Sequence, residues 1–204
     1  MQNLYLYILT YLIAGIPFGY LLARHFGGVN IKQEGSGNIG ATNVLRVLKS
    51  RDPALAKKLG AMTLLLDMLK GVIMVLIAKA LGADASVVWT VAVLAVLGHC
   101  FSIFMGFEGG KGVATGVGVV AAAAWPLALI ALGAWIAAAK GLKISSLAAI
   151  VAIAVMMGAA YLLYPDGLPG VGTHVPLWII AWVILYKHLP NIMRLIRGEE
   201  AAIA

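Results

Sequence analysis

The stretch "VATGVGVVAAAAWPLALIALGAWIAAA", residues 113–139, makes up most of the longest apolar run, 112–139, and decides how often this chain crosses a membrane. The run is longer than the roughly 20 apolar residues that one membrane helix needs. Pro126 lacks a backbone N–H and disfavours helical geometry at the residue before it, so Trp125 and Pro126 form a candidate break. The run is therefore one long span or two short helices of about 13 residues, roughly 20 Å each. Such short helices need local bilayer thinning or cover by other helices.

The composition already indicates a membrane protein. The chain has 204 residues, of which 62% are hydrophobic and 11% are charged. A soluble domain of this size needs far more polar surface, so the soluble globular class is excluded. Five further apolar runs have about the length of a span, the last being somewhat short: 4–24, 59–82, 86–105, 145–164 and 175–189.

The cationic residues set the expected orientation. No basic residue precedes the first run, whereas the loop after it holds Arg24, Lys32, Arg46, Lys49, Arg51, Lys57 and Lys58. The positive-inside rule places this loop in the cytoplasm and the N-terminus outside. Six spans would leave the basic tail "KHLPNIMRLIRGEE", residues 187–200, outside, whereas seven spans bring it inside. We therefore predict an all-α, polytopic helical membrane protein with seven transmembrane helices, a cytoplasmic C-terminus and one domain, 1–204.

A glycine motif raises the question of a nucleotide. The segment "EGSGNIGATN", residues 34–43, has the G-x-G-x-x-G spacing at Gly35, Gly37 and Gly40. A dinucleotide fingerprint needs a preceding strand and an acidic residue about twenty positions later. Here a membrane run precedes the glycines and the distant position falls near Met62, so dinucleotide binding is excluded. A Walker A loop is excluded as well, because a glycine follows Lys111.

Two loops nevertheless keep the features that phosphate-binding loops share. Glycines let backbone N–H groups turn toward an anion. The first loop adds neutral donors and a guanidinium, from Ser36, Asn38, Thr42, Asn43 and Arg46. The second, "EGGKGVAT" (108–115), places Lys111 among Gly109, Gly110 and Gly112 at the start of an apolar helix, where an anion is favoured. Either loop alone could be an interfacial turn with snorkelling cations, but the two together favour an anion site.

The tail supplies a third candidate cluster. Lys187, Asn191 and Arg194 are spaced i, i+4 and i+7, which places them on one face of a helix unless Pro190 breaks the turn. The cluster is either a positive-inside anchor or a third wall of the anion site, with His188 as a proton acceptor.

Charged residues inside the apolar runs are costly and therefore informative. Asp67 and Lys70 lie three residues apart in the second run, and we expect them to pair. His99 is either a site residue or a buried, hydrogen-bonded histidine. Cys100 is expected to pack as a small apolar residue. No metal-binding motif is present, so we predict no metal, no cofactor and no nucleic-acid partner.

The three polar segments resemble the motifs of the bacterial acyl-phosphate:glycerol-3-phosphate acyltransferases, which are integral membrane proteins. The matching segments are "GSGNIGATNVLR" (35–46), "GHCFSIFMGFEGGKGVAT" (98–115) and "KHLPNIMRLIRGEE" (187–200), in order along nearly the whole chain. One departure is Glu108, where the family more often has a basic residue. The acid is expected to weaken a peripheral phosphate contact, while Lys111 is retained.

The resemblance implies an enzyme that moves a fatty acyl group from acyl phosphate to the 1-hydroxyl of sn-glycerol 3-phosphate. The products are 1-acylglycerol 3-phosphate and inorganic phosphate, and the reaction opens phospholipid synthesis. It also implies a site that faces the cytoplasm from the bacterial inner membrane, at the surface of the lipid bilayer. The expected catalytic residues are Ser36, Lys111, His188 and Asn191. The expected substrate-binding residues are Gly35, Gly37, Asn38, Gly40, Thr42, Asn43, Arg46, His99, Gly109, Gly110, Gly112 and Arg194.

Two questions stay open at this point. The general base is either His188 or a phosphate oxygen of the acyl donor. A transporter of a phosphorylated anion would use similar helix ends, although its site would lie near the membrane midplane.

Overall fold

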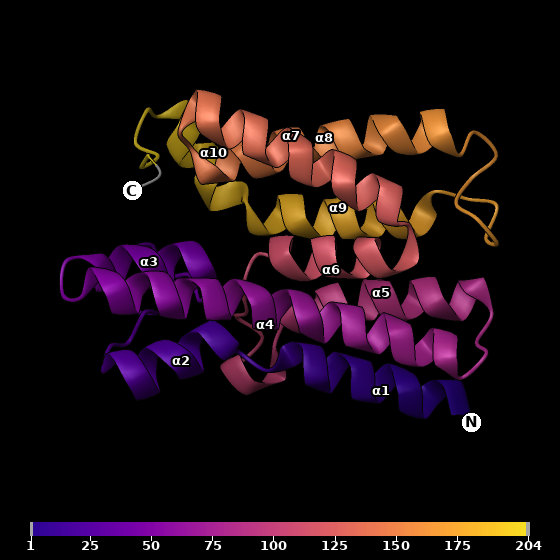
Figure 1. Ribbon diagram of the computed structural model, residues 1–204, viewed down its shortest axis with the longest axis horizontal. Helices are drawn as coiled ribbons and strands as arrows, with labels where there is room; N and C mark the ends of the chain where they lie inside the picture. Colours follow the sequence, from indigo (N-terminus) through magenta and orange to yellow (C-terminus); the bar gives the residue numbers. More distant parts are fainter. Residues whose placement is uncertain (1, 203–204) are drawn as a thin grey trace.

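The computed structural model describes residues 2–202, which form helices joined by turns and loops (Figure 1). Within this range no strand is present, so the prediction of an all-α fold is confirmed. The helices are α1 (Gln2–Gly15), α2 (Phe18–Gly27), α3 (Ala41–Lys49), α4 (Pro53–Ala80), α5 (Ala85–Cys100), the short 3-10 helix η1 (Ile103–Met105), α6 (Val113–Ala123), α7 (Trp125–Leu142), α8 (Ser145–Leu163), α9 (Val175–Lys187) and α10 (Leu189–Ile196).

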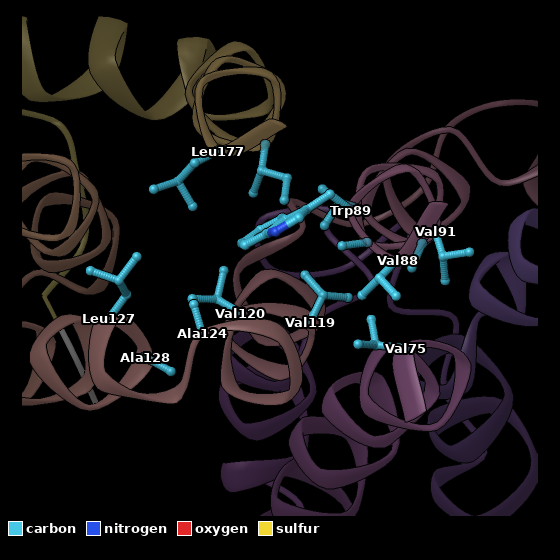
Figure 2. Packing of buried hydrophobic residues seen from close by; sticks show 14 of the residues in the cluster. Val75, Val88, Trp89, Val91, Val119, Val120, Ala124, Leu127, Ala128 and Leu177 are labelled. Atoms are coloured by element: carbon cyan, nitrogen blue, oxygen red, sulfur yellow. The ribbon is translucent and has the colours of Figure 1, made fainter. Parts of the chain in front are cut away.

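The long helices lie side by side along one direction (Figure 1). α1, α4 and α5 make one layer, α7 and α8 make another, and α6 packs against both α4 and α7. Figure 2 shows the core between them, where Trp89 of α5 lies between Val119 of α6 and Leu177 of α9. The two halves of the chain therefore share one apolar core.

The outer surfaces of the helices are apolar as well. Five segments are long and apolar enough to cross a membrane, namely Asn3–Gly27, Pro53–Ala80, Ala85–Met105, Trp125–Leu142 and Ser145–Leu163. A sixth is the bent pair formed by α9 and α10, while α6 is shorter. Exposed large apolar side chains such as Leu64, Leu76, Leu162 and Trp182 suit contact with lipid. The fold is thus that of a multi-pass membrane protein.

The long apolar run does break where the sequence indicates. α6 ends at Ala123, Ala124 leaves the helical region with φ −149° and ψ 70°, and Pro126 lies in the first turn of α7. The chain then turns back, as Figure 1 shows. The halves are unequal, with 11 residues in α6 and 18 in α7, rather than similar in length as expected. Lys79 donates to the carbonyl of Ala122 (2.6 Å), which satisfies a group that the end of α6 leaves free.

The first apolar run, 4–24, is not one continuous helix, which corrects the sequence-based expectation. It divides into α1 and α2 at Ile16 and Pro17, because Pro17 has no N–H for a helical hydrogen bond. The carbonyls freed by the break are bound by side chains: Lys70 donates to Ile16 (2.9 Å) and Ser102 donates to Gly15.

The last run, 175–189, also ends earlier than expected. α9 stops at Lys187, and α10 leaves it at 55°, with Pro190 in its first turn. The Lys187 ammonium lies 5.1 Å from the centre of the Phe101 ring. The chain therefore bends next to Pro190, which is the exception that the spacing argument allowed, and Lys187 does not share a helix face with Asn191 and Arg194.

The loop between the first two runs is more ordered than the hydropathy suggests. It contains α3, and α4 begins at Pro53, six residues before the predicted start at position 59. The Asp52 carboxylate accepts from the N–H groups of Ala54 and Leu55 at 3.0 Å each, and Pro53 occupies the first turn. An aspartate followed by a proline strongly favours the start of a helix, so the sequence already indicated that α4 begins at Pro53.

We predict that Gly118→Ala destabilises the protein by about 1–3 kcal/mol, because a methyl group there would overlap the Met68 carbonyl of α4. Gly133→Ala is the matched control: it also lies inside a helix but has open space, so it should be neutral or stabilise by up to ~1 kcal/mol. Thermal unfolding of both variants in detergent measures the difference. Equal unfolding temperatures would contradict close packing of α6 on α4.

Candidate active site

A cavity of about 720 Å³ lies between α3, α4 and α6 on one side and α7 to α10 on the other. Its polar lining comes from loops, from α3 and α10, from the start of α8 and from the tail, and includes Ser36, Arg46, Lys111, Ser146, His188, Asn191, Arg194 and Glu200. Its apolar lining comes from the membrane helices and includes Leu64, Val120, Leu132, Ile153, Met156 and Ile184. One cavity thus combines a polar, cationic end with an apolar extension.

Most of the residues predicted for the site meet at this cavity. They are Gly35, Ser36, Asn38, Gly40, Thr42, Asn43, Arg46, His99, Lys111, Gly112, His188, Asn191 and Arg194. Gly37, Gly109 and Gly110 do not line it. The three motif segments, which are far apart in the sequence, are therefore neighbours in space.

The first motif loop is held in shape by one buried side chain. The Asn43 amide donates to the carbonyls of Ile31, Glu34 and Asn38 at 2.8–3.2 Å, and its oxygen accepts from the Ser36 N–H at 2.8 Å. Because its donors are already engaged, Asn43 shapes the loop, which differs from the prediction that it donates to a phosphate.

The glycines of this loop have a local reason. Gly35 and Gly37 have φ angles of 63° and 70°, in the left-handed region that residues with a Cβ rarely adopt. The Gly37 N–H closes a turn onto the Glu34 carbonyl (3.1 Å). The turn presents Ser36 and Asn38 to the cavity.

Two helices begin at the cavity. α3 starts after Gly40 and α6 starts after Gly112, and neither start is capped by a side-chain hydrogen bond. The first N–H groups of a helix have no partner within the helix and carry partial positive charge. Two such starts facing one cavity favour an anionic ligand.

Lys111 and Arg46 add full charges to this end of the cavity. Among residues 2–202 neither of them forms an ion pair with a carboxylate. Burial lowers the pKa of Lys111 to about 8; Glu200 opposes this change, whereas the nearby cations Arg194 and Arg46 add to it. A phosphate placed between these cations would supply the missing negative charge.

His188 is held in one tautomer. Its Nδ1 lies 2.7 Å from the Ile184 carbonyl, which can only accept, so Nδ1 must carry the proton. The neutral ring then has its free electron pair on Nε2. This arrangement suits a proton acceptor, because the buried ring cannot easily rotate away from the carbonyl.

Glu200 is a cavity residue that the sequence analysis did not single out. Its carboxylate accepts from Ser146 (2.8 Å), Asn191 (2.5 Å) and the Nε of Arg194 (2.7 Å). Burial raises the pKa of Glu200, but these hydrogen bonds outweigh burial and hold it below its ordinary value. The sequence signal for this residue was the pair of acids, Glu199 and Glu200, at the end of an otherwise basic tail.

These bonds leave one group of Asn191 free. Its amide nitrogen is used by Glu200, and among the described residues its buried Oδ1 has no hydrogen-bond partner. A buried acceptor without a partner costs free energy, so it indicates a donor on a ligand, such as a hydroxyl group.

Glu108 does not line the cavity. It pairs with Lys32 at 3.0 Å on the exposed surface, and the hydrogen bond from Lys32 lowers its pKa. The pair joins the segment just before the first motif loop to the second loop. Exposed pairs of this kind contribute little to stability, so the acid at this position has a local effect only.

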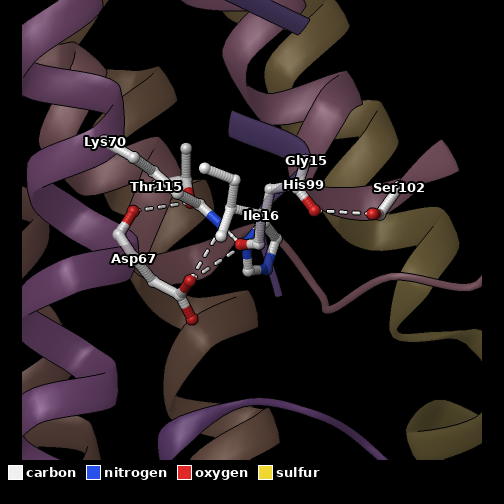
Figure 3. Close-up of polar contacts among 7 residues, drawn as sticks. All are labelled: Gly15, Ile16, Asp67, Lys70, His99, Ser102 and Thr115. Atoms are coloured by element: carbon white, nitrogen blue, oxygen red, sulfur yellow. Dashed lines mark hydrogen bonds and ion pairs between the residues drawn. The ribbon is translucent and has the colours of Figure 1, made fainter. Parts of the chain in front are cut away.

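Asp67, Lys70 and His99 lie close to one another (Figure 3). Lys70 pairs with Asp67 at 2.8 Å, which confirms the predicted pairing. His99 Nδ1 lies 3.6 Å from the same Asp67 oxygen, and Asp67 and His99 both line the cavity. His99 is therefore both buried and adjacent to the site.

Comparison with known proteins agrees with the motifs. The glycerol-3-phosphate acyltransferase family matches residues 4–198. Glycerol-3-phosphate acyltransferase of Wolinella succinogenes is 51% identical over 98% of this chain and 96% of its own. The Campylobacter concisus protein of the same name is 54% identical over 98% of both chains.

A solved structure has the same fold. PlsY (YgiH), an integral membrane glycerol 3-phosphate acyltransferase, in its glycerol 3-phosphate form, superposes with a TM-score of 0.88 at 38% identity. The match covers 100% of this chain and 96% of that chain. The lysophosphatidic acid form gives a TM-score of 0.84 at 39% identity, over 99% and 95%. This chain therefore belongs to the glycerol-3-phosphate acyltransferase family.

Proposed function

We propose that this protein transfers a fatty acyl group from acyl phosphate to the 1-hydroxyl of sn-glycerol 3-phosphate. The products are 1-acylglycerol 3-phosphate and inorganic phosphate. The observation that carries the proposal is the single cavity that joins two uncapped helix starts and unpaired cations to an apolar extension. Both substrates carry phosphate, and the donor also carries an acyl chain, so the two kinds of lining match the two kinds of group.

The polar end suits glycerol 3-phosphate. Its phosphate would lie between Lys111, Arg46 and the helix starts. Its hydroxyl would donate to the free Oδ1 of Asn191, which needs such a donor. Proton removal falls to Nε2 of His188 or to a phosphate oxygen of the acyl donor.

Acyl phosphate is a mixed anhydride whose phosphate leaves readily, so the protein needs no nucleophile of its own. Holding the hydroxyl about 3–3.5 Å from the acyl carbon supplies much of the rate enhancement. Lys111 and the N–H groups at the start of α6 stabilise the developing negative charge and the departing phosphate. The acyl chain extends between α4, α6 and α8, along Leu64, Val120 and Met156.

We further propose one domain, 1–204, with seven spans in the bacterial inner membrane, the N-terminus outside and the site facing the cytoplasm. Three observations support this topology. α6 and α7 run in opposite directions from the break at Ala124. α3, α10 and the basic tail lie at one end of the molecule, and the N-terminus lies at the other (Figure 1). The positive-inside rule assigns the basic end to the cytoplasm.

The central test uses purified protein in detergent with acyl phosphate and glycerol 3-phosphate. We expect 1-acylglycerol 3-phosphate and free phosphate to form only when both substrates are present. Lys111→Ala should lower kcat/KM by about 10²–10³-fold, as the loss of one charge-stabilising group does. Lys57→Ala is the matched control, because Lys57 is an exposed cation outside the cavity and its loss should change little.

Two outcomes would contradict these assignments. If Lys111→Ala keeps full activity, the assignment of Lys111 to the active site is wrong. Uptake of glycerol 3-phosphate into sealed liposomes without any acyl product would favour the transporter instead.

The pKa of Lys111 predicts a pH profile. A lysine is cationic below its pKa, so with a value of about 8 the charge is lost as the pH rises through 8. We expect kcat/KM for glycerol 3-phosphate to fall above about pH 8, because this ratio reports the free enzyme. Lys111→Arg stays charged, so its activity, although lower than that of the wild-type protein, should not fall with pH up to about pH 10. A wild-type profile that is flat between pH 7 and about pH 10 would contradict the shifted pKa.

Glu200→Gln should reduce activity by about tenfold. The neutral amide cannot accept from Asn191, Arg194 and Ser146 together, so the cavity groups lose their common anchor. Glu108→Gln removes the same charge from an exposed residue that does not line the cavity, and it should keep activity within about threefold. Steady-state assays with varied glycerol 3-phosphate compare the two variants, and equal losses would argue against a specific role for Glu200.

A further inference from the structure

Three charged or ionisable side chains are buried beneath the second motif loop and have no part in the chemistry above. Asp67 and Lys70 of α4 and His99 of α5 are 3%, 4% and 5% exposed. Figure 3 shows them converging beside the Ile16 carbonyl at the break between α1 and α2. Burying charge is expensive, so such a cluster requires a reason beyond packing.

His99 supports the turn that carries Lys111. Its carbonyl accepts from the Gly110 N–H (3.1 Å), and the next carbonyl, of Cys100, accepts from Gly109 (3.1 Å). The His99 ring lies directly against Gly110, since a Cβ at position 110 would overlap Nε2. Gly110 does not have a positive φ, so a side chain is excluded there by the ring and not by the backbone conformation.

Asp67 faces the other side of the His99 ring. Its Oδ1, which also contacts the Lys70 ammonium, lies 3.6 Å from Nδ1, and Nδ1 has no hydrogen-bond partner among residues 2–202. A small rotation of either side chain would close this distance to a hydrogen bond. The imidazole is thus enclosed between a carboxylate at Nδ1 and the Gly110 turn at Nε2.

The position of Asp67 is fixed by Lys70 and by a hydrogen bond to its own backbone carbonyl. Lys70 contacts Asp67 at 2.8 Å and donates to the Ile16 carbonyl at 2.9 Å. The Asp67 carbonyl accepts from Thr115 in the first turns of α6 (2.8 Å). Asp67 is therefore connected to the start of α6, to α5 and to the break after α1.

We propose that Asp67 and His99 are positioning residues that hold the Gly109–Lys111 turn, and through it the Lys111 ammonium, in the geometry needed for acyl transfer. A turn made of glycines has few side-chain contacts of its own to restrict it. A displacement of about 1 Å at a reacting group can cost 10²-fold in rate, so a rigid support behind the turn has a large effect. This inference rests on the proposed function, because it assigns Lys111 its role there.

A double-mutant cycle separates positioning from general damage to the fold. Asp67→Asn should lower kcat/KM by about tenfold when Lys111 is present, and by less than about twofold in the Lys111→Ala background. A residue that acts through Lys111 has nothing left to position once that side chain is gone. The same factor in both backgrounds would overturn the proposal.

Variants of His99 give an independent answer. The amide of His99→Gln reaches the position of Nε2 and can still support Gly110, whereas the amide of His99→Asn occupies only the position of Nδ1. We expect His99→Gln to retain at least fivefold more activity than His99→Asn, with the difference absent in the Lys111→Ala background. Equal activity of the two, or the reverse order, would overturn a role for the Nε2 edge.

Two controls keep the outcomes distinct. Asp67→Asn leaves the Lys70 charge unpaired, so the double variant Asp67→Asn/Lys70→Met is measured beside it. If both Asp67 variants are unfolded, the comparison of His99→Gln with His99→Asn decides the question. Thr63→Val removes a buried α4 hydroxyl that bonds only the Leu59 carbonyl, and it should retain activity. If the wild-type protein transfers no acyl group, the proposed function itself is refuted. If it does transfer the group but Asp67→Asn lowers the rate by the same factor with and without Lys111, only this inference is refuted.

Discussion

Backbone groups freed inside an apolar environment must be bound by the protein itself, and this constraint organises the fold. Where α1 ends at Pro17, Ser102 and Lys70 bind the carbonyls of Gly15 and Ile16. Where α6 ends, Lys79 binds the carbonyl of Ala122. Each break is therefore stabilised by a side chain from another part of the chain, and the helices can end inside the molecule, where a site can form.

The same constraint gives the site its chemistry. The starts of α3 and α6 keep N–H groups free at the cavity, and Lys111 lies between them and the tail. Within the described chain Arg46 and Lys111 form no ion pair there, and Glu200 is held by Arg194 and Asn191. A bound phosphate would give these two cations an anionic partner.

Part of this site could be predicted residue by residue. Motifs of glycine, lysine and asparagine have a chemical meaning wherever they lie, so Lys111, His188 and Asn191 could be chosen before their positions were known. Asn43 and Glu200 show the limit. Both belong to the motif segments, but whether a polar side chain faces a ligand or holds a loop depends on which carbonyls and cations surround it. The break between α1 and α2 at Pro17 was not predicted, because hydropathy shows that a segment is apolar but not whether its helix is continuous.

The sequence by itself determined the class of the fold, the break near Pro126 and the polar segments, because hydropathy, proline geometry and charge are local properties. Only the tertiary structure decided which segments meet. It placed Lys187 on Phe101 and Glu108 on Lys32, away from the cavity, and it brought Asp67 and His99 beneath the turn that carries Lys111. These contacts join residues on different helices, and no local property of the chain encodes the distance between them.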